Sequence, residues 1–266
     1  SVIETYNTEK EVLLAWQKLI QRENPDIIIG YNIFGFDYQF MFKRAEQTQC
    51  VEEFLKLSRN KGEVCGSQSG DPLRWSIEEN TIILASGEHD LHFIKMNGRL
   101  QVDLYNLFRR DYNLESYKLD SVSGHFIGDN VIKLDYNEGG TLIKSKNLQG
   151  LENGNYISFE EIGHSTDYYK DGAKFEVCDV NNVDGTFRIK TEERPDSSKQ
   201  IKWSLAKDDI GPQDIFRLTN EGPAERSIVA KYCIQDCNLV QHLLSKIDII
   251  TGFVEMAKIC SVPMSY

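Results

Sequence analysis

Two short stretches of the sequence carry residues whose types and spacing could do chemistry. In the first, residues 25–42, an apolar run at residues 27–29 ends at Gly30, and a single carboxylate, Asp37, follows before helical spacing resumes. Such a run without polar alternation is typical of a strand covered on both faces. We expect Asp37 to project from the carboxyl edge of a mixed sheet, which is where open α/β sheets bind ligands.

The second stretch, residues 230–244, holds a phenol and a carboxylate at helical spacing. Tyr232 and Asp236 are four residues apart, so a helix would stack them on one face. A phenol can orient a water molecule while a carboxylate holds a divalent cation, and oxygen ligands suit Mg²⁺ or Mn²⁺. On spacing alone, however, such a pair is more often solvated than functional.

Taken together, the two stretches resemble the second and third exonuclease motifs of the B-family DNA polymerases of the polymerase-delta type. In that family the second motif reads Asn-x-x-x-Phe-Asp and the third reads Tyr-x-x-x-Asp. The matching residues are Asn32, Phe36 and Asp37 in the second motif and Tyr232 and Asp236 in the third. The likeness continues through residues 98–128 and 254–266, so it covers most of the chain outside one segment.

The resemblance implies an α/β, ribonuclease H-like mixed-sheet exonuclease fold and the 3′-to-5′ proofreading activity of a DNA polymerase. In the family, two Mg²⁺ or Mn²⁺ ions assist hydrolysis of the 3′-terminal phosphodiester of DNA, which releases a nucleoside monophosphate. The implied roles are metal binding for Asp37 and Asp236, water orientation for Tyr232, and DNA contact for Asn32, Phe36 and Lys118. For Lys118 a merely solvated lysine remains an equal alternative, and the family match makes Asp103 structural.

The family's first exonuclease motif, an Asp-x-Glu that bridges both metals, is not found in this sequence. Glu4 lies too near Asp37 to belong to it, and Val2 stands where the aspartate would be. Polymerase-domain signatures are missing too. We therefore expect an interior piece of a longer polymerase, inactive by itself. Two alternatives are a catalytically silent module that binds single-stranded DNA or braces a polymerase, and a nucleotide- or protein-binding module with chance motif matches.

Composition limits the partners. The net charge of −11 argues against broad duplex binding driven by counterion release, but it suits a carboxylate-built metal site. The expected partners are a single-stranded 3′ end, a primer–template and the rest of the polymerase chain, with a sliding clamp as a further candidate. No run is long enough for a membrane span. The resemblance implies an intracellular location, in the host nucleus or at a cytoplasmic replication site if the protein is viral.

Six cysteines show no disulfide-rich spacing, which indicates reduced thiols. Cys233 and Cys237, with His242 nearby, could be imagined as a zinc site. No second cysteine or histidine pair accompanies them, so packing in the core is the favoured interpretation.

Local patterns predict the elements around these residues. Thr8 and Glu11 form a capping box that starts a helix over residues 8–22. Further predicted helices cover residues 105–112, 119–126, 222–244 and 249–259. Predicted strands cover residues 81–85, 91–94 and 100–103, the first two separated by a turn at Gly87. In the segment after Asp37, Phe40, Met41 and Ala45 resume the helical apolar spacing.

The sequence changes character between residues 137 and 206. Short runs that alternate apolar and polar residues, at 141–146, 155–162, 174–180 and 186–191, predict a β-rich insertion that divides an exonuclease domain of residues 1–136 and 207–266. The sequence of this segment resembles insertions in polymerases of large nucleocytoplasmic DNA viruses. Its aromatic residues could stack bases, but we favour the core of a small barrel. These residues are Tyr156, Phe159, Tyr168, Tyr169 and Phe175.

Overall fold

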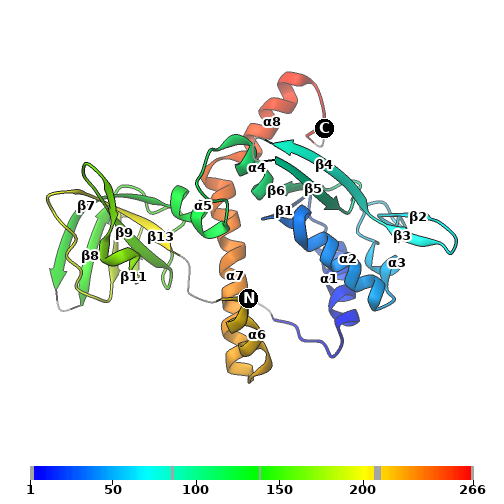
Figure 1. Cartoon of the computed structure of the whole chain (residues 1–266), viewed down its shortest axis with the longest axis horizontal. Helices are drawn as coiled ribbons and strands as arrows, with labels where there is room; N and C mark the ends of the chain where they lie inside the picture. Colours follow the sequence, from blue (N-terminus) through cyan, green and yellow to red (C-terminus); the bar gives the residue numbers. More distant parts are fainter. Residues whose placement is uncertain (1–2, 85–86, 138, 207–210, 265–266) are drawn as a thin grey trace. The chain divides into compact units, whose positions relative to one another are not determined.

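The structure, a computed structural model, describes residues 3–84, 87–137, 139–206 and 211–264 (Figure 1). The chain divides into two compact units. The first comprises residues 1–113 and 254–266, and the second comprises residues 114–253. Helices and strands are both abundant, so the predicted α/β class is confirmed.

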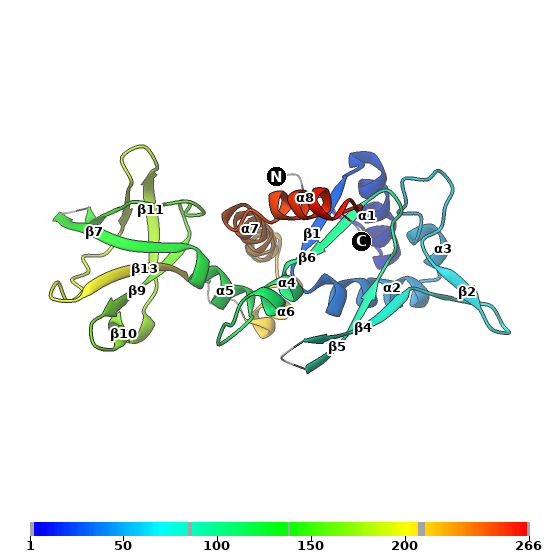
Figure 2. The ribbon, with the colours of Figure 1, turned by 90° about the horizontal axis from the view of Figure 1, so that it is seen from above.

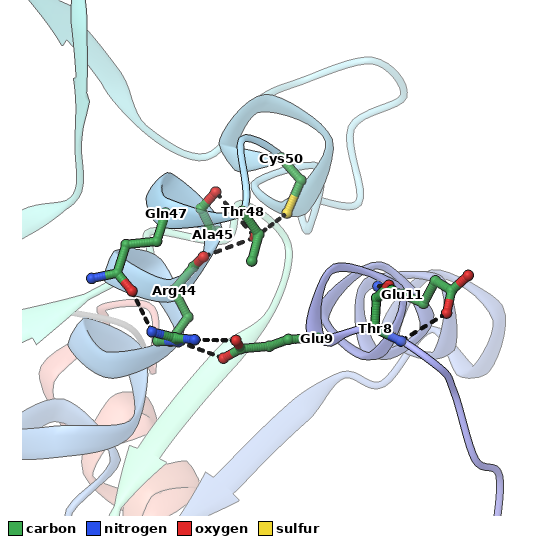
Figure 3. A network of polar contacts seen from close by, with 8 residues as sticks. All are labelled: Thr8, Glu9, Glu11, Arg44, Ala45, Gln47, Thr48 and Cys50. Carbon is green, nitrogen blue, oxygen red and sulfur yellow. Dashed lines mark hydrogen bonds and ion pairs between the residues drawn. The ribbon is translucent and has the colours of Figure 1, made fainter.

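The first helix of the first unit, α1 (Glu9–Glu23), begins with the predicted capping box. The Thr8 hydroxyl accepts a hydrogen bond from the Glu11 amide at 3.3 Å, and the Glu11 carboxylate accepts one from the Thr8 amide at 3.0 Å (Figure 3). The guanidinium of Arg44, on α2 (Tyr38–Gln47), forms an ion pair with Glu9. This pair ties the start of α1 to the helix that follows Asp37.

Two parallel strands lie beside these helices. β1 (Ile27–Gly30) pairs with β6 (Leu100–Asp103) in a register that sets Gly30 opposite Asp103. The carboxyl ends of both strands therefore meet at one edge. All four residues of β1 are half-buried, so the expected complete cover on both faces is wrong. In the described residues these two strands form a two-stranded parallel sheet, so the expected ribonuclease H-like mixed sheet stays a prediction.

Two short helices and two hairpins also belong to the first unit. α4 (Leu104–Asp111) follows β6 directly and buries Leu104, Leu107 and Phe108. α3 (Val51–Phe54) contributes to the core. One hairpin joins β2 (Ser67–Ser69) to β3 (Arg74–Ser76), and the other joins β4 (Glu78–Leu84) to β5 (Gly87–Phe93). The predicted strands at 81–85 and 91–94 are thus confirmed except at two residues: Ile94 follows the end of β5, and residue 85 lies outside the described residues.

The second unit contains a closed β-barrel. Its strands are β7 (Gly128–Asn137), β8 (Gly140–Ser145), β9 (Tyr156–Ile162), β10 (Thr166–Tyr168), β11 (Phe175–Asn181), β12 (Thr186–Ile189) and β13 (Gln200–Ala206). The order is β10-β9-β11-β12-β8-β7-β13, and an additional pairing of β13 with β9 closes the sheet (Figure 2). A short 3₁₀ turn, η2 (Tyr169–Gly172), follows β10.

The barrel is filled by aromatic and branched side chains. Trp203 is fully buried, its indole Nε1 donates to Ser145 Oγ at 3.0 Å, and its ring meets Phe187 edge-on. Phe159 and Phe175 are buried and their rings lie 5.7 Å apart, which confirms the core interpretation for these two. Tyr168 is 61% exposed and does not belong to this core.

The barrel starts earlier in the chain than the predicted insertion. β7 begins at Gly128 and pairs with both β8 and β13, so nine residues assigned from sequence to the exonuclease domain, 128–136, contribute to the barrel sheet. The division into residues 1–136, 137–206 and 207–266 stays a prediction.

The helices α5, α6 and α7 belong to the second unit. α5 (Leu119–Phe126), which has its predicted bounds, packs against β13 and against α7 (Pro223–Lys246), and α6 (Pro212–Asn220), which the sequence did not indicate, packs against α7. Leu239, Val240 and Leu243 are the buried residues of α7 and lie in its carboxyl half. α8 (Ile249–Cys260) follows α7, and its residues from Val254 onward belong to the first unit. Among the described helices, none has the length and apolar character that a membrane crossing requires.

Candidate active site

The connection between β1 and α2 is a tight, irregular turn. Asn32 adopts the left-handed conformation (φ 62°, ψ 26°), which asparagine tolerates better than most residues. A π-helical turn over Ile33–Asp37 follows, closed by a hydrogen bond from the Tyr38 amide to the Ile33 carbonyl. Single π-helical turns occur often at functional sites. This turn delivers Asp37 to the start of α2, as the sequence predicts.

A buried carboxylate, Asp103, organises the turn from the neighbouring strand. Its Oδ1 accepts hydrogen bonds from the amides of Asn32 (2.7 Å) and Tyr105 (3.0 Å). Its Oδ2 accepts from the amide of Phe34 (3.0 Å) and the side chain of Asn106 (3.3 Å). Burial raises the pKa of Asp103, against the lowering effect of the three backbone donors. The structural role predicted for Asp103 is confirmed.

Asp37 has a different environment from Asp103. Its side chain reaches solvent, although partial burial by the surrounding protein still raises its pKa. Among the described residues, no other residue forms a hydrogen bond or ion pair with the Asp37 carboxylate. One carboxylate at this sheet edge is therefore saturated with donors, and the other has its oxygens available for a ligand.

Two glycines allow the turn to be this tight. A Cβ atom on Gly35 would lie 2.3 Å from Asn32 Oδ1, and one on Gly30 would lie 2.3 Å from Ile33 Cγ2. The Asn32 side chain thus covers the backbone of Gly35. This contact gives Asn32 a place in the turn, and its contact with DNA stays a prediction.

Phe36, in the π-helical turn, and Phe40, in the first turn of α2, are both exposed, by 59% and 51%. The predicted helical spacing is confirmed for Ala45, which is buried, and for Met41, which packs against the core, but it is wrong for Phe40. Phe40 was not predicted as a surface residue. Its spacing of four from Phe36, a residue already expected at the surface, was the available signal.

On α7, Tyr232 and Asp236 lie on one helical face, as predicted, and both are half-buried with partners of their own. Cys233 and Cys237 are exposed, so the expectation that they pack in the core is wrong. Burial first, and Asp236 as a nearby charge, raise the pKa of both thiols, which disfavours the thiolate that zinc requires.

The described part of the chain contains no preformed metal-binding cluster of side chains. It contains no group of three or more histidine, cysteine, aspartate or glutamate side chains arranged to hold an ion. His242 instead lies 3.3 Å from Glu152. Asp37 belongs to the first unit and Tyr232 and Asp236 to the second, so their meeting at one site stays a prediction.

Lys118 directly precedes α5 as its N-cap residue and is exposed. Its amide donates to Ser116 Oγ at 3.4 Å. The exposure is compatible with a phosphate contact and equally with a solvated lysine, and its DNA contact stays a prediction.

The role of Asp103 can be measured. In Asp103→Asn, the new amide group must face backbone donors on one side, so we expect a loss of about 2 kcal/mol of local stability. Native-state hydrogen exchange should show reduced protection of the Asn32 and Phe34 amides. Asp26→Asn is the control, because Asp26 is 81% exposed in a surface pair with Arg59. Unchanged protection of both amides in Asp103→Asn would contradict the assignment.

Comparison with known proteins identifies the family. Residues 1–122 match the sequence profile of the DNA polymerase family B exonuclease domain. The chain is 48% identical over 262 residues to a DNA polymerase of Phaeocystis pouchetii virus, an alignment that covers 97% of the chain and 25% of that polymerase. It is 36% identical to a DNA polymerase of Pyramimonas orientalis virus, with 98% of the chain and 19% of the relative covered.

A third relative matches as well. The chain is 27% identical to a DNA polymerase delta catalytic subunit of Oryza sativa subsp. japonica, with 98% of the chain and 16% of the subunit covered. The chain thus spans a quarter or less of the length of these three relatives. On these matches, residues 1–122 belong to the exonuclease-domain family of the B-family DNA polymerases, and nearly the whole chain is similar to a part of viral and delta-type DNA polymerases.

Proposed function

We propose that this chain forms the greater part of a 3′-to-5′ proofreading exonuclease that removes the terminal nucleotide of a DNA strand within a DNA polymerase. The observation that carries the proposal is a pair of carboxylates, Asp103 at the end of β6 and Asp37 at the end of the turn that follows β1. Asp103 is saturated by four donors and holds the turn, whereas Asp37 is open to a ligand. The match of residues 1–122 to an exonuclease domain supports it.

The donor chemistry at Asp37 fits Mg²⁺ or Mn²⁺. Its ligand atoms are carboxylate oxygens, which hard divalent cations prefer, and its raised pKa shows that a compensating positive charge would be favourable there. When bound, such cations supply charge stabilisation to the attacking and leaving oxygens of a phosphodiester. Asp37 would hold one cation and Asp236 the other.

The remaining roles fall to the helix α7. Tyr232, one turn before Asp236 on the same face, would orient the attacking water through its hydroxyl. Asp236 would keep that water in line with the scissile bond. The proposal includes the Asp-x-Glu of the family's first motif, which the 266 residues do not contain, as a further source of carboxylates from other residues of the polymerase. On this proposal the isolated chain would be inactive.

DNA with a free 3′ end and the rest of the polymerase are the partners of this function. Its place is inside the cell, wherever the DNA is replicated. The direct test is release of nucleoside monophosphate from a 3′ end by a polymerase that contains this chain, in the presence of Mg²⁺ or Mn²⁺. Binding of strand ends without hydrolysis would favour the silent module instead.

Tyr232→Phe tests the water-orienting role. The variant loses a hydroxyl and no charge, so we expect the exonuclease rate to fall roughly 10²-fold, at the low end of the effects seen when a proton-handling group is removed. A single-turnover assay on a single-stranded end measures it. Tyr168→Phe, at an exposed tyrosine of the barrel, is the control and should keep the wild-type rate. A Tyr232→Phe enzyme with the wild-type rate would remove Tyr232 from the mechanism.

A further inference from the structure

The β4–β5 hairpin lies against the turn that carries Asp37. Strand β5 packs against both the π-helical turn and α2. Two consecutive residues of β5 make specific contacts there. The ring of Phe93 lies 5.8 Å from the ring of Phe34, and the imidazole of His92 meets the side chain of Gln39. Because Phe34 stands three residues before Asp37 and Gln39 two residues after it, the hairpin contacts the chain on both sides of the candidate metal ligand.

The contact between His92 and Gln39 is a defined hydrogen bond. Gln39 Nε2 and His92 Nε2 lie 2.9 Å apart. An amide nitrogen can only donate, so the imidazole Nε2 accepts and the proton of the neutral ring lies on Nδ1. That nitrogen has no hydrogen-bond partner among the described residues, and Glu79 Oε1 lies 3.4 Å from it. The His92 side chain is only 16% exposed, so water competes little for its bond to Gln39.

The bond fixes a degree of freedom that the other contacts of α2 leave open. Tyr38, Phe42 and Ala45 hold one face of the helix in the core. Gln39 follows Tyr38 by one residue, roughly 100° around the helix axis. Its bond to His92 therefore opposes rotation of the helix start about that axis. A rotation of about 10° would move a group that lies roughly 5–6 Å from the axis by about 1 Å.

Such a displacement matters for Asp37. Asp103 holds the amides of Asn32 and Phe34, which both precede Asp37 in the turn. Within the described residues, no hydrogen bond or ion pair holds the Asp37 carboxylate itself. Its direction thus depends on the segments on either side of it, and a misplacement of about 1 Å in an active site can lower the rate by roughly 10²-fold.

We propose that the β4–β5 hairpin positions Asp37 for its reaction, with His92 as a positioning residue that acts through Gln39. The proposal rests on the proposed exonuclease function, in which Asp37 holds a cation. Asp103 fixes the start of the turn, and His92 fixes the rotation of α2 where the turn ends. Loss of either member of the His92–Gln39 pair would misdirect Asp37 while the core of the first unit stays folded.

The test is single-turnover release of nucleotide by a polymerase that contains this chain. We expect Gln39→Leu and His92→Leu each to lower the maximal rate about tenfold, which is less than a full 1 Å displacement would cost. The strand concentration at half-saturation and the rate of primer extension should stay unchanged. The double variant should be no slower than the slower single variant, because the two residues act through one bond. Gln68→Leu and His164→Leu, at an exposed glutamine of β2 and an exposed histidine of the barrel, are the controls.

A conservative variant separates positioning from folding. His92→Gln places an amide oxygen at about the position of Nε2, so it can still accept from Gln39 and should recover the wild-type rate to within about threefold. Hydrogen exchange read by mass spectrometry on the same polymerase gives a second measurement without metal or activity. Exchange of the amides of residues 35–39 should be faster in both leucine variants and normal in His92→Gln.

Four results would overturn the proposal. They are a wild-type rate in either leucine variant, additive losses in the double variant, no recovery in His92→Gln, or an equal loss of primer extension, which would show a general folding defect. The exonuclease proposal fails separately, if the wild-type polymerase releases no nucleotide. In that case hydrogen exchange decides alone, and unchanged exchange of residues 35–39 in both leucine variants would refute the role of His92.

Discussion

Replacing Asp37 or Asp236 by alanine in a polymerase that contains this chain is expected to reduce degradation of a 3′ single-stranded end by about 10³-fold or more. Each change removes an anionic metal ligand, and charge stabilisation by a catalytic cation is worth several kcal/mol. Primer extension should survive, because it uses a separate site. Nucleotide release and extension, measured on the same preparation, check both statements.

The double variant tests whether the two aspartates act together. If Asp37 and Asp236 serve one metal site, Asp37→Ala/Asp236→Ala should be no slower than the slower single variant, because residues that act as a unit are strongly non-additive. Asp26→Ala and Asp214→Ala are controls on exposed, ion-paired aspartates of the first and second units. Equal activity of Asp236→Ala and wild type would refute the metal assignment.

The second prediction concerns the nuclease activity of the 266-residue chain by itself. With Mg²⁺ or Mn²⁺ it should show no nuclease activity above background, and its metal affinity should be weak, roughly in the millimolar range, for lack of anionic ligands. Fusion or co-expression of a polymerase segment that carries Asp-x-Glu should restore release of nucleotides from the 3′ end. Changing that aspartate to alanine should abolish the restored activity.

Two measurements decide this prediction. Isothermal titration with Mn²⁺ gives the affinity, and a 5′-labelled single strand shows any shortening from the 3′ end. The Asp37→Asn chain is the matched control, since it keeps the shape of the side chain and removes its charge. Robust nuclease activity in the wild-type 266-residue chain would show that the metal site is complete within it, with Glu4 the first residue to test as a ligand.

Local sequence patterns predicted several elements well. The Thr8–Glu11 capping box sets the start of α1, and residues 119–126 form α5 at the predicted bounds. The β-branched run at residues 27–29 forms β1. These features depend on side-chain to backbone bonds or on steric preferences over a few residues, so they can be read without knowledge of the tertiary contacts.

Exposure was predicted less well than secondary structure. Helical spacing placed Phe40 with Met41 and Ala45; Ala45 is buried in the core of the first unit with Tyr38 and Phe42, but Phe40 is exposed. Cys233 and Cys237 were expected inside and lie at the surface of α7. The spacing of apolar residues shows that a helix has a buried face, but where several stripes are apolar it does not show which stripe meets the core.

By itself, the sequence determined the α/β class and the positions of several helices and strands, because local propensity resides in consecutive residues. The residues proposed for catalysis come from the family resemblance and stay a prediction. Only the tertiary structure decided which of these residues form hydrogen bonds with one another. Asp103 lies 71 residues after Asn32, yet the parallel register of β1 and β6 brings them within 2.7 Å. The amides of Asn32 and Phe34, 71 and 69 residues earlier in the chain, supply two of the four donors to Asp103. The difference between the saturated Asp103 and the open Asp37 is therefore absent from either local pattern.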